Sequence, residues 1–150
     1  MTPHMTGLAR RGCAVIDLAL VIGLSSFACD HRSAPMTRSV PVALAAPPEP
    51  QALESAIERS LAQRHWTIKE HQPGKYVAAL SERGHSATIA VLYDAQSARV
   101  DYVDSQGLMY EKDSDGEKIH RSYNTWVKSL ANDIKVNLSQ AQPSAASASK

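Results

Sequence analysis

The chain has 150 residues, enough for one modest domain, and its formal net charge is +1 at pH 7. This near-neutral balance argues against a nucleic-acid-binding protein, which would carry a marked excess of basic residues. The two cysteines, Cys13 and Cys29, both lie near the start of the chain. The remainder therefore has neither a disulfide framework nor a thiolate metal site.

Residues 1–28 predict an export signal. Arg10 and Arg11 supply a positively charged beginning, and an apolar run follows at residues 14–28. The most apolar part of that run, residues 18–24, is too short for a transmembrane helix, which needs roughly 20 apolar residues. The sequence therefore places the mature protein outside the cytoplasm.

Cys29 is the predicted lipidation site. Lipoprotein signals place a small residue directly before the acylated cysteine, and Ala28 fits that position, whereas Ser26 stands where leucine is usual. Acylation would make Cys29 the first residue of the mature protein and hold it stably at a membrane. Asp30, in the next position, resembles an inner-membrane retention signal of enteric-type bacteria. A plain secretory signal cleaved nearby is the alternative.

Composition divides the mature chain into three parts. Residues 29–50 hold five of the eight prolines, which predicts a semi-extended tether behind the lipidated cysteine. Residues 139–150 are small and polar, as is typical of a disordered tail. Residues 51–138 lie between these segments and predict a compact domain.

The pattern of this domain is that of an α+β fold. Apolar residues recur at helical spacing in residues 51–65 and again in residues 119–138. Between the helices, alternating apolar and polar residues predict four strands, at about residues 66–69, 76–80, 87–93 and 100–102. We therefore expect a two-layer domain. In it, a four-stranded antiparallel β-meander carries the N-terminal and the C-terminal helix on one face.

Asp104, Ser105 and His120 have the residue types of a hydrolytic triad. Asp104 and Ser105 are adjacent, however, and would point to opposite faces of a strand. No Gly-x-Ser-x-Gly turn surrounds Ser105. The sequence "DSQG" at residues 104–107 is more typical of a turn. We therefore expect no catalytic residues, and a hydrolase is the least favoured interpretation.

Residues 111–118, "EKDSDGEK", match part of a calcium-binding loop. Asp113, Asp115 and Gly116 have suitable spacing, but Ser122 stands where the bidentate glutamate is required. The histidines show no H-x-x-x-H or H-E-x-x-H arrangement that would favour zinc. We therefore expect a solvated acidic loop, no metal and no cofactor.

The start of the last predicted helix carries three polar residues of interest. His120 is expected near the N-cap, where its ring would contact a backbone amide or Tyr110. Tyr123 lies on the apolar stripe and needs a partner for its hydroxyl, for which Asp104 is the predicted acceptor. Asn124 has low helix propensity and is expected to cap another segment or contact a partner. The candidate binding residues are Asp104, Ser105, Tyr110, His120, Tyr123 and Asn124.

Five segments carry a resemblance, namely "ALESAIERSLAQRHW", "PGKYVAAL", "ERGHSATIAVLYD", "VDYVDSQGLMY" and "IHRSYNTWVKSLANDI". Together they resemble a family of small Gram-negative lipoproteins to which no activity is assigned. The most specific matches lie at residues 102–105 and 119–126. His65 replaces the usual glycine of the family, and Gly107 its usual asparagine. The resemblance implies export and a small α+β domain, and it implies no chemistry.

These features predict a non-enzymatic lipoprotein on the periplasmic side of the cell envelope. Its partners would be the membrane, through the lipid anchor, and an envelope protein or a cell-wall component. The alternative is a soluble periplasmic domain that binds a small ligand through the candidate residues. A concave pocket at those residues would favour the alternative, whereas a filled core would favour the lipoprotein.

Overall fold

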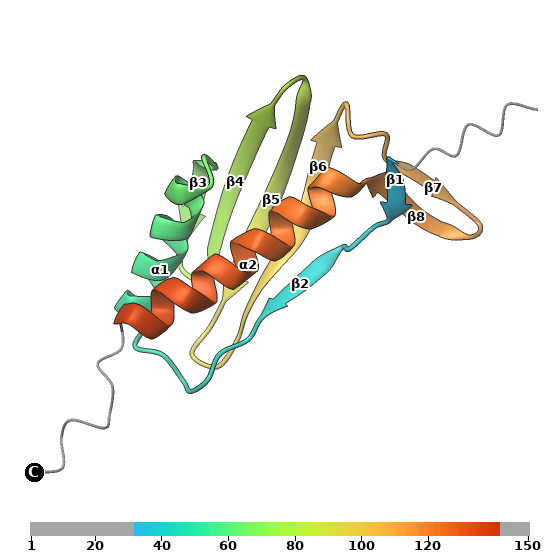
Figure 1. Cartoon of the computed structure of the whole chain (residues 1–150). Coiled ribbons are helices and arrows are strands. Elements are labelled where there is room, and N and C mark those ends of the chain that lie inside the picture. Colours follow the sequence, from blue (N-terminus) through green and yellow to red (C-terminus); the bar gives the residue numbers. More distant parts are fainter. Residues whose placement is uncertain (1–31, 142–150) are drawn as a thin grey trace, which may run out of the picture.

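The computed structural model describes residues 32–141 and shows an α+β fold (Figure 1). The predicted signal at residues 1–28, Cys29, Asp30 and residues 142–150 of the predicted tail lie outside the described residues. The elements are β1 (Ser33–Pro35), β2 (Ser39–Val42), α1 (Pro50–Gln63), β3 (Thr67–Gln72), β4 (Lys75–Glu82), β5 (His85–Tyr93), β6 (Ala98–Gln106), β7 (Glu111–Asp113), β8 (Gly116–His120) and α2 (Arg121–Ala141).

The strands of the described chain form two antiparallel sheets. The larger sheet has the order β2-β6-β5-β4-β3, and α1 and α2 both cover the same face of it (Figure 1). Its strands β3 to β6 follow one another as a meander, as the alternating pattern predicts. The predicted number of four strands is too low, because β2 adds a fifth strand beside β6. The smaller sheet has the order β1-β8-β7 and was not predicted.

The predicted tether is wrong over residues 33–42, which form β1 and β2. β1 pairs with β8, and β2 pairs with β6 over its whole length. The prolines do not prevent this, because Pro35 and Pro41 lie on edge strands, where one missing N–H group is tolerated. The domain therefore begins well before residue 51.

The last helix begins later and ends later than predicted. Ile119 and His120 belong to β8, and α2 runs from Arg121 to Ala141. Residues 139–141 of the predicted disordered tail are thus helical. Neither α1 nor α2, the helices of the described residues, is long and apolar enough to cross a membrane.

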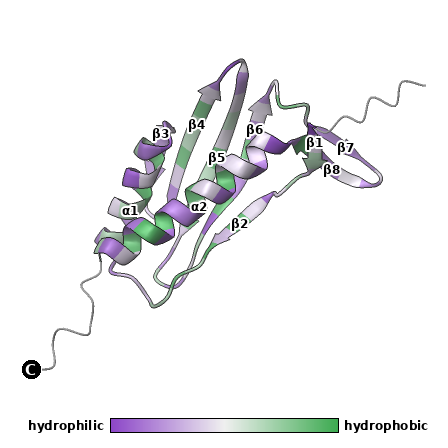
Figure 2. Ribbon diagram, viewed as in Figure 1, coloured by the Kyte–Doolittle hydropathy of each residue, from purple (hydrophilic) through white to green (hydrophobic). Residues whose placement is uncertain are grey.

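The core fills the space between the large sheet and the two helices (Figure 2). Trp66 is buried there, whereas Trp126 is only partly buried and packs against the core. The largest side chains with less than 2% of their surface exposed include Tyr76, Tyr123, Leu53, Ile57, Leu61, Ile89, Leu130 and Ile134. A filled apolar core of this kind is the main source of stability in a small domain.

The end of α1 is set by a backbone turn at His65. The amide of Trp66 donates to the carbonyl of Leu61 at 2.9 Å, and the amide of His65 donates to that of Ala62 at 3.1 Å. This pair of bonds requires a left-handed residue after the helix, and His65 has φ of 59°. Glycine is the residue that adopts this conformation most easily, so His65 is strained here.

Candidate functional site

A β-bulge at Val103 decides where the candidate residues on β6 point. Ile89 of β5 pairs with Tyr102, but the preceding Thr88 pairs with Asp104, so Val103 is an extra residue in β6. The extra residue resets the alternation of side chains between the two faces. Tyr102 and Ser105 consequently share the inner face. Asp104 pairs with Thr88 on the opposite face, which no helix covers.

The predicted contact between Tyr123 and Asp104 is therefore wrong. It assumed an unbroken strand, in which Asp104 would follow Tyr102 on the same face. The hydroxyl of Tyr123 is buried and has no hydrogen-bond partner among the described residues. Burial raises the pKa of Tyr123. The turn predicted at residues 104–107 is also displaced, because β6 continues to Gln106.

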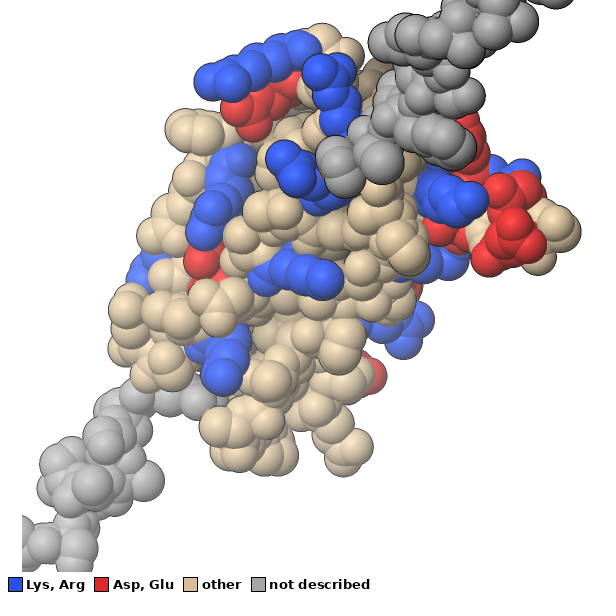
Figure 3. All heavy atoms as spheres, turned by 45° about the vertical axis from the view of Figure 1, so that its right-hand side comes forward, with Lys and Arg blue, Asp and Glu red and all other residues tan. Residues whose placement is uncertain are grey.

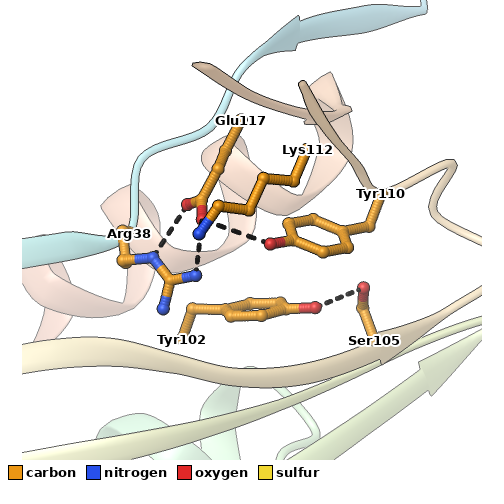
Figure 4. Close-up of polar contacts among 6 residues, drawn as sticks. All are labelled: Arg38, Tyr102, Ser105, Tyr110, Lys112 and Glu117. Carbon is orange, nitrogen blue, oxygen red and sulfur yellow. Dashed lines mark hydrogen bonds and ion pairs between the residues drawn. The ribbon is translucent and has the colours of Figure 1, made fainter. Parts of the chain in front are cut away.

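Tyr102 forms the centre of an aromatic cluster (Figure 4). Its ring stacks on that of Tyr110 with centroids 5.5 Å apart, and the ring of Tyr123 meets it edge-on at 5.4 Å. The guanidinium carbon of Arg38 lies 5.7 Å from the ring centroid of Tyr102, within range of a cation–π contact. The hydroxyl groups of Tyr102 and Ser105 are 3.0 Å apart and hydrogen bonded.

The carboxylate of Glu117 contacts several polar side chains above this cluster (Figure 4). Nε and Nη2 of Arg38 donate to its two carboxylate oxygens at 2.8 Å each, a bidentate geometry. The hydroxyl of Tyr110 donates to it at 3.2 Å, and Nζ of Lys112 lies 3.4 Å away. The hydrogen bond from Arg38 lowers the pKa of Glu117 to about 2 and raises that of Arg38. We call Arg38, Tyr102, Ser105, Tyr110, Tyr123 and Glu117 the Tyr102 cluster.

The Tyr102 cluster lacks the contacts of a hydrolytic triad. The hydroxyl of Ser105 is bonded to Tyr102, and Asp104 faces away from it. Nδ1 of His120 accepts the backbone amide of Ser122 at 3.2 Å. This confirms the predicted contact between His120 and a free amide at the start of the last helix. The ring of His120 stacks on His85, with centroids 5.2 Å apart.

Asn124 caps another segment of the chain, as its low helix propensity predicts. Its Oδ1 accepts the amide of Thr37 at 2.9 Å, and its Nδ2 donates to the carbonyl of Pro35 at 2.8 Å. These bonds hold the connection between β1 and β2 against α2. Asn124 is therefore a structural clamp on the N-terminal segment.

The acidic loop at residues 111–118 is the β7–β8 hairpin. Oδ1 of Asp113 accepts the amide of Asp115 at 2.9 Å, and Lys118 pairs with the other oxygen of Asp113. Within residues 32–141, no three His, Cys, Asp or Glu side chains are grouped so that they could hold a metal ion. The carboxylate of Asp113 is engaged in the turn and in an ion pair, and that of Glu117 pairs with Arg38 and Lys112.

The sequence did not indicate Arg38, Tyr102 or Glu117 as parts of one cluster. Arg38 and Glu117 are 79 residues apart, and each lay in a segment predicted to be solvated. The one signal near Arg38 is the short apolar alternation of Val40 and Val42, which is compatible with a strand but is only two residues long.

Two hollows of the surface are relevant to binding. An open depression of about 400 Å³ adjoins the Tyr102 cluster and is lined by Arg38, Ser39, Arg99, Asp101 and Tyr102. A second, less open one of about 350 Å³ lies between the end of α1, the end of β4 and α2. Both tryptophans contribute to it, together with Gln63, Arg64, His65, Leu80, Glu82, Thr125 and Ser129.

Comparisons with protein-family models, with curated proteins and with solved structures gave no match to this chain.

Proposed function

We propose that the protein is a non-enzymatic lipoprotein of the cell envelope, anchored through acylated Cys29, whose domain binds a protein or cell-wall partner on the periplasmic side. The supporting observation is the position of the first strand. β1 begins at Ser33, four residues after Cys29, and is paired with β8. An acyl anchor at Cys29 would therefore act directly on the folded domain, and not through a tether of twenty residues.

Several contacts fix this N-terminal segment to the domain. The amide of Arg121 donates to the carbonyl of Arg32 at 2.8 Å, and that of Tyr102 donates to the carbonyl of Arg38 at 2.9 Å. Asn124 adds two further bonds between these points. Such an arrangement suits a module held in a set position at a surface, where it presents one face to a partner.

The resolved pKa shifts are consistent with residues of fixed charge. General acids and bases work best with a pKa near the operating pH. Among the described residues, each resolved shift moves away from neutrality. The pKa values of two arginines and three tyrosines are raised, and those of Asp94, Asp113 and Glu117 are lowered. Groups with these shifts keep one charge state at neutral pH, as is expected of structural and binding residues.

The anchor is tested by the intact mass of the mature protein from membrane and soluble fractions, beside the Cys29→Ala chain. We expect a membrane-bound species that begins at Cys29 and carries acyl mass, and we expect both properties to disappear in the variant. An unmodified soluble species from the unaltered chain would refute the lipoprotein proposal.

The partner is tested by placing a photo-crosslinking amino acid at Arg99, beside the depression at the Tyr102 cluster, in living cells. Exposed Arg59 on α1 is the matched control position. We expect a discrete adduct from position 99 and none from position 59, or else co-sedimentation of the protein with isolated cell-wall sacculi. Absence of both would contradict the proposed binding role.

A soluble periplasmic protein that binds a small ligand is the second candidate. The hollow that favours it lies between Trp66 and Trp126 and includes none of the six candidate binding residues, so the predicted location of the ligand is not the one supported. Its volume of about 350 Å³ and its mixture of aromatic and polar residues are typical of small-ligand pockets. Titration of tryptophan fluorescence with monosaccharides and amino acids would test it. A saturable change in fluorescence that is lost in Trp126→Ala would support this candidate. No change with any of the monosaccharides or amino acids would oppose it.

A further inference from the structure

We propose that the end of the domain that carries Met109 rests on the membrane, with Met109 among the lipid headgroups and nearby arginines facing anionic phospholipid. This inference rests on the proposed function, because it requires the acyl anchor at Cys29. We call this region, defined by Arg32, Arg83, Met109, Tyr110 and Arg121, the Met109 end.

The covalent chain brings the anchor close to this end. Only two residues separate Cys29 from Arg32, so their Cα atoms lie within about 11 Å of each other, at up to ~3.6 Å per residue. The carbonyl of Arg32 accepts the amide of Arg121 at 2.8 Å, which fixes its position at the start of α2. An acylated Cys29 would thus hold this part of the domain near the bilayer.

Met109 lies beside the same point of the fold. The carbonyl of Leu108 accepts the amide of His120 at 2.7 Å, and His120 is also the strand partner of Ser33. Buried Leu108 anchors the loop, and the next residue, Met109, turns outward with φ of 49° and 39% of its surface exposed. An exposed methionine is costly in water and favourable at a lipid interface.

Three arginines belong to segments that adjoin the Met109 loop. His85 bonds the carbonyl of Gly107 at 2.7 Å, which ties the β4–β5 turn, with its exposed Arg83, to the Met109 loop. Arg32 and Arg121 are exposed as well. Four acidic residues belong to the β7–β8 hairpin, which begins directly after Tyr110, and Figure 3 shows acidic side chains there and at other places on this face. Glu82 approaches Arg83 at 3.9 Å and offsets part of its charge. Basic residues next to an anchor favour anionic lipid surfaces.

Tyr110 completes the apolar part of this end. It is 37% exposed, and its hydroxyl is bonded to Glu117 at 3.2 Å. Tyrosine is enriched at membrane–water interfaces, because its ring prefers an apolar setting while its hydroxyl remains hydrated. The Met109 end therefore joins an attachment point, apolar side chains and positive charge on one surface.

The test uses the acylated full chain with Met109→Cys, which supplies a unique thiol because Cys29 is acylated and Cys13 is predicted to leave with the signal. Cysteine is no more hindered than methionine at this backbone angle. A nitroxide attached there is measured in vesicles of phosphatidylglycerol and phosphatidylethanolamine, by its relaxation with oxygen and with an aqueous nickel chelate. Val136→Cys is the matched control, since Val136 is 42% exposed and lies about 22 Å along α2 from Arg121.

We expect the label at position 109 to be several-fold less accessible to the nickel chelate than the label at position 136. Arg83→Cys, at an exposed turn of the same end, serves as a second position should the Met109 variant fail to fold. Equal accessibility at both ends, in a chain that carries acyl mass and floats with vesicles, would overturn this inference and leave the proposed anchor intact.

The remaining outcomes are also decisive. A chain without acyl mass that fails to float would overturn the anchor and, with it, the membrane contact. Equal protection of position 109 in phosphatidylcholine vesicles would overturn the role of the arginines, whereas weaker protection there would support it.

Discussion

The two halves of α2 hold the domain together in different ways. The C-terminal part, taken from Leu130 onward, packs on α1 and has Leu130 and Ile134 fully buried, with a buried hydrogen bond from Asn137 to Ser60 at 2.8 Å. The N-terminal half holds the segment around β1 and β2 through Asn124 and contributes Tyr123 to the Tyr102 cluster. Burial stabilises the contact between α2 and α1, whereas directional polar bonds hold the segment around β1 and β2 on α2. The contact with α1 should therefore dominate global stability, and the polar bonds should determine how well the N-terminal segment is ordered.

The largest effect is expected from Leu130→Ala. Leu130 is fully buried in the core, so its truncation removes apolar contacts and leaves a cavity. We expect the free energy of unfolding to fall by about 3 kcal/mol, within a typical range of about 2–5 kcal/mol. Urea denaturation provides the measurement, and Lys128→Ala on the exposed side of α2 is the control. A loss below about 1 kcal/mol would show that this half of α2 is not dominated by burial.

Asn124→Ala should act on the contacts of the N-terminal half of α2. It leaves the amide of Thr37 and the carbonyl of Pro35 without their side-chain partner, which costs about 1–3 kcal/mol. Hydrogen exchange should accelerate in residues 33–42 more than in β4 and β5. Exposed Asn132→Ala on the same helix is the control. Uniform acceleration across the domain would mean that the N-terminal segment is not a separate unit of stability.

The difference between the two halves also explains how much of the fold could be predicted. Burial leaves a periodic pattern, and from it the helices, the meander and the α+β class follow. β2 left only Val40 and Val42 on either side of Pro41, a pattern too short to separate from a proline-rich tether. The bulge at Val103 left no signal in the sequence, yet it turned Asp104 away from Tyr123.

The candidate site was predicted only in part for the same reason. Ser105, Tyr110 and Tyr123 do meet around Tyr102, because residues near the end of β6 and the start of α2 lie side by side. Glu117 meets Arg38 across 79 residues, and no local pattern can indicate such a pair. Polar contacts between distant segments depend on the finished fold, so sequence alone placed neither residue there.

His65→Gly should stabilise the domain. His65 follows the end of α1, the helix that packs on the C-terminal half of α2. His65 has φ of 59°, a conformation that costs a non-glycine residue about 1 kcal/mol. We therefore expect a gain of about 1 kcal/mol, measured as a higher urea midpoint. Ala62→Gly, inside α1, should have the opposite sign and cost about 1 kcal/mol. Equal losses in both variants would show that His65 makes contacts that outweigh its backbone strain.

The smallest effect on stability is expected from Glu117→Gln, which tests the exposed ion pair between Glu117 and Arg38. The pKa of Glu117 falls from its ordinary value of 4.5 to about 2, because Arg38 donates hydrogen bonds to the carboxylate. The folded state therefore holds the proton less tightly than the unfolded state, and the stabilising contribution is complete above about pH 4.5. It is lost as the pH falls through about 2. Arg38 stays charged throughout, since its own pKa is raised.

The variant should accordingly be slightly less stable than the parent chain at pH 7, and the gap should narrow between pH 4.5 and 2. Thermal unfolding at a series of pH values measures it, with Glu111→Gln on the same hairpin as the control for a general loss of negative charge. Salt should shrink the gap at pH 7, because the pair is exposed and screened. A gap that stays constant down to pH 2 would mean that Glu117 contributes through packing and not through its charge. In that case the Tyr102 cluster would resemble the buried half of α2 more closely than its polar contacts suggest.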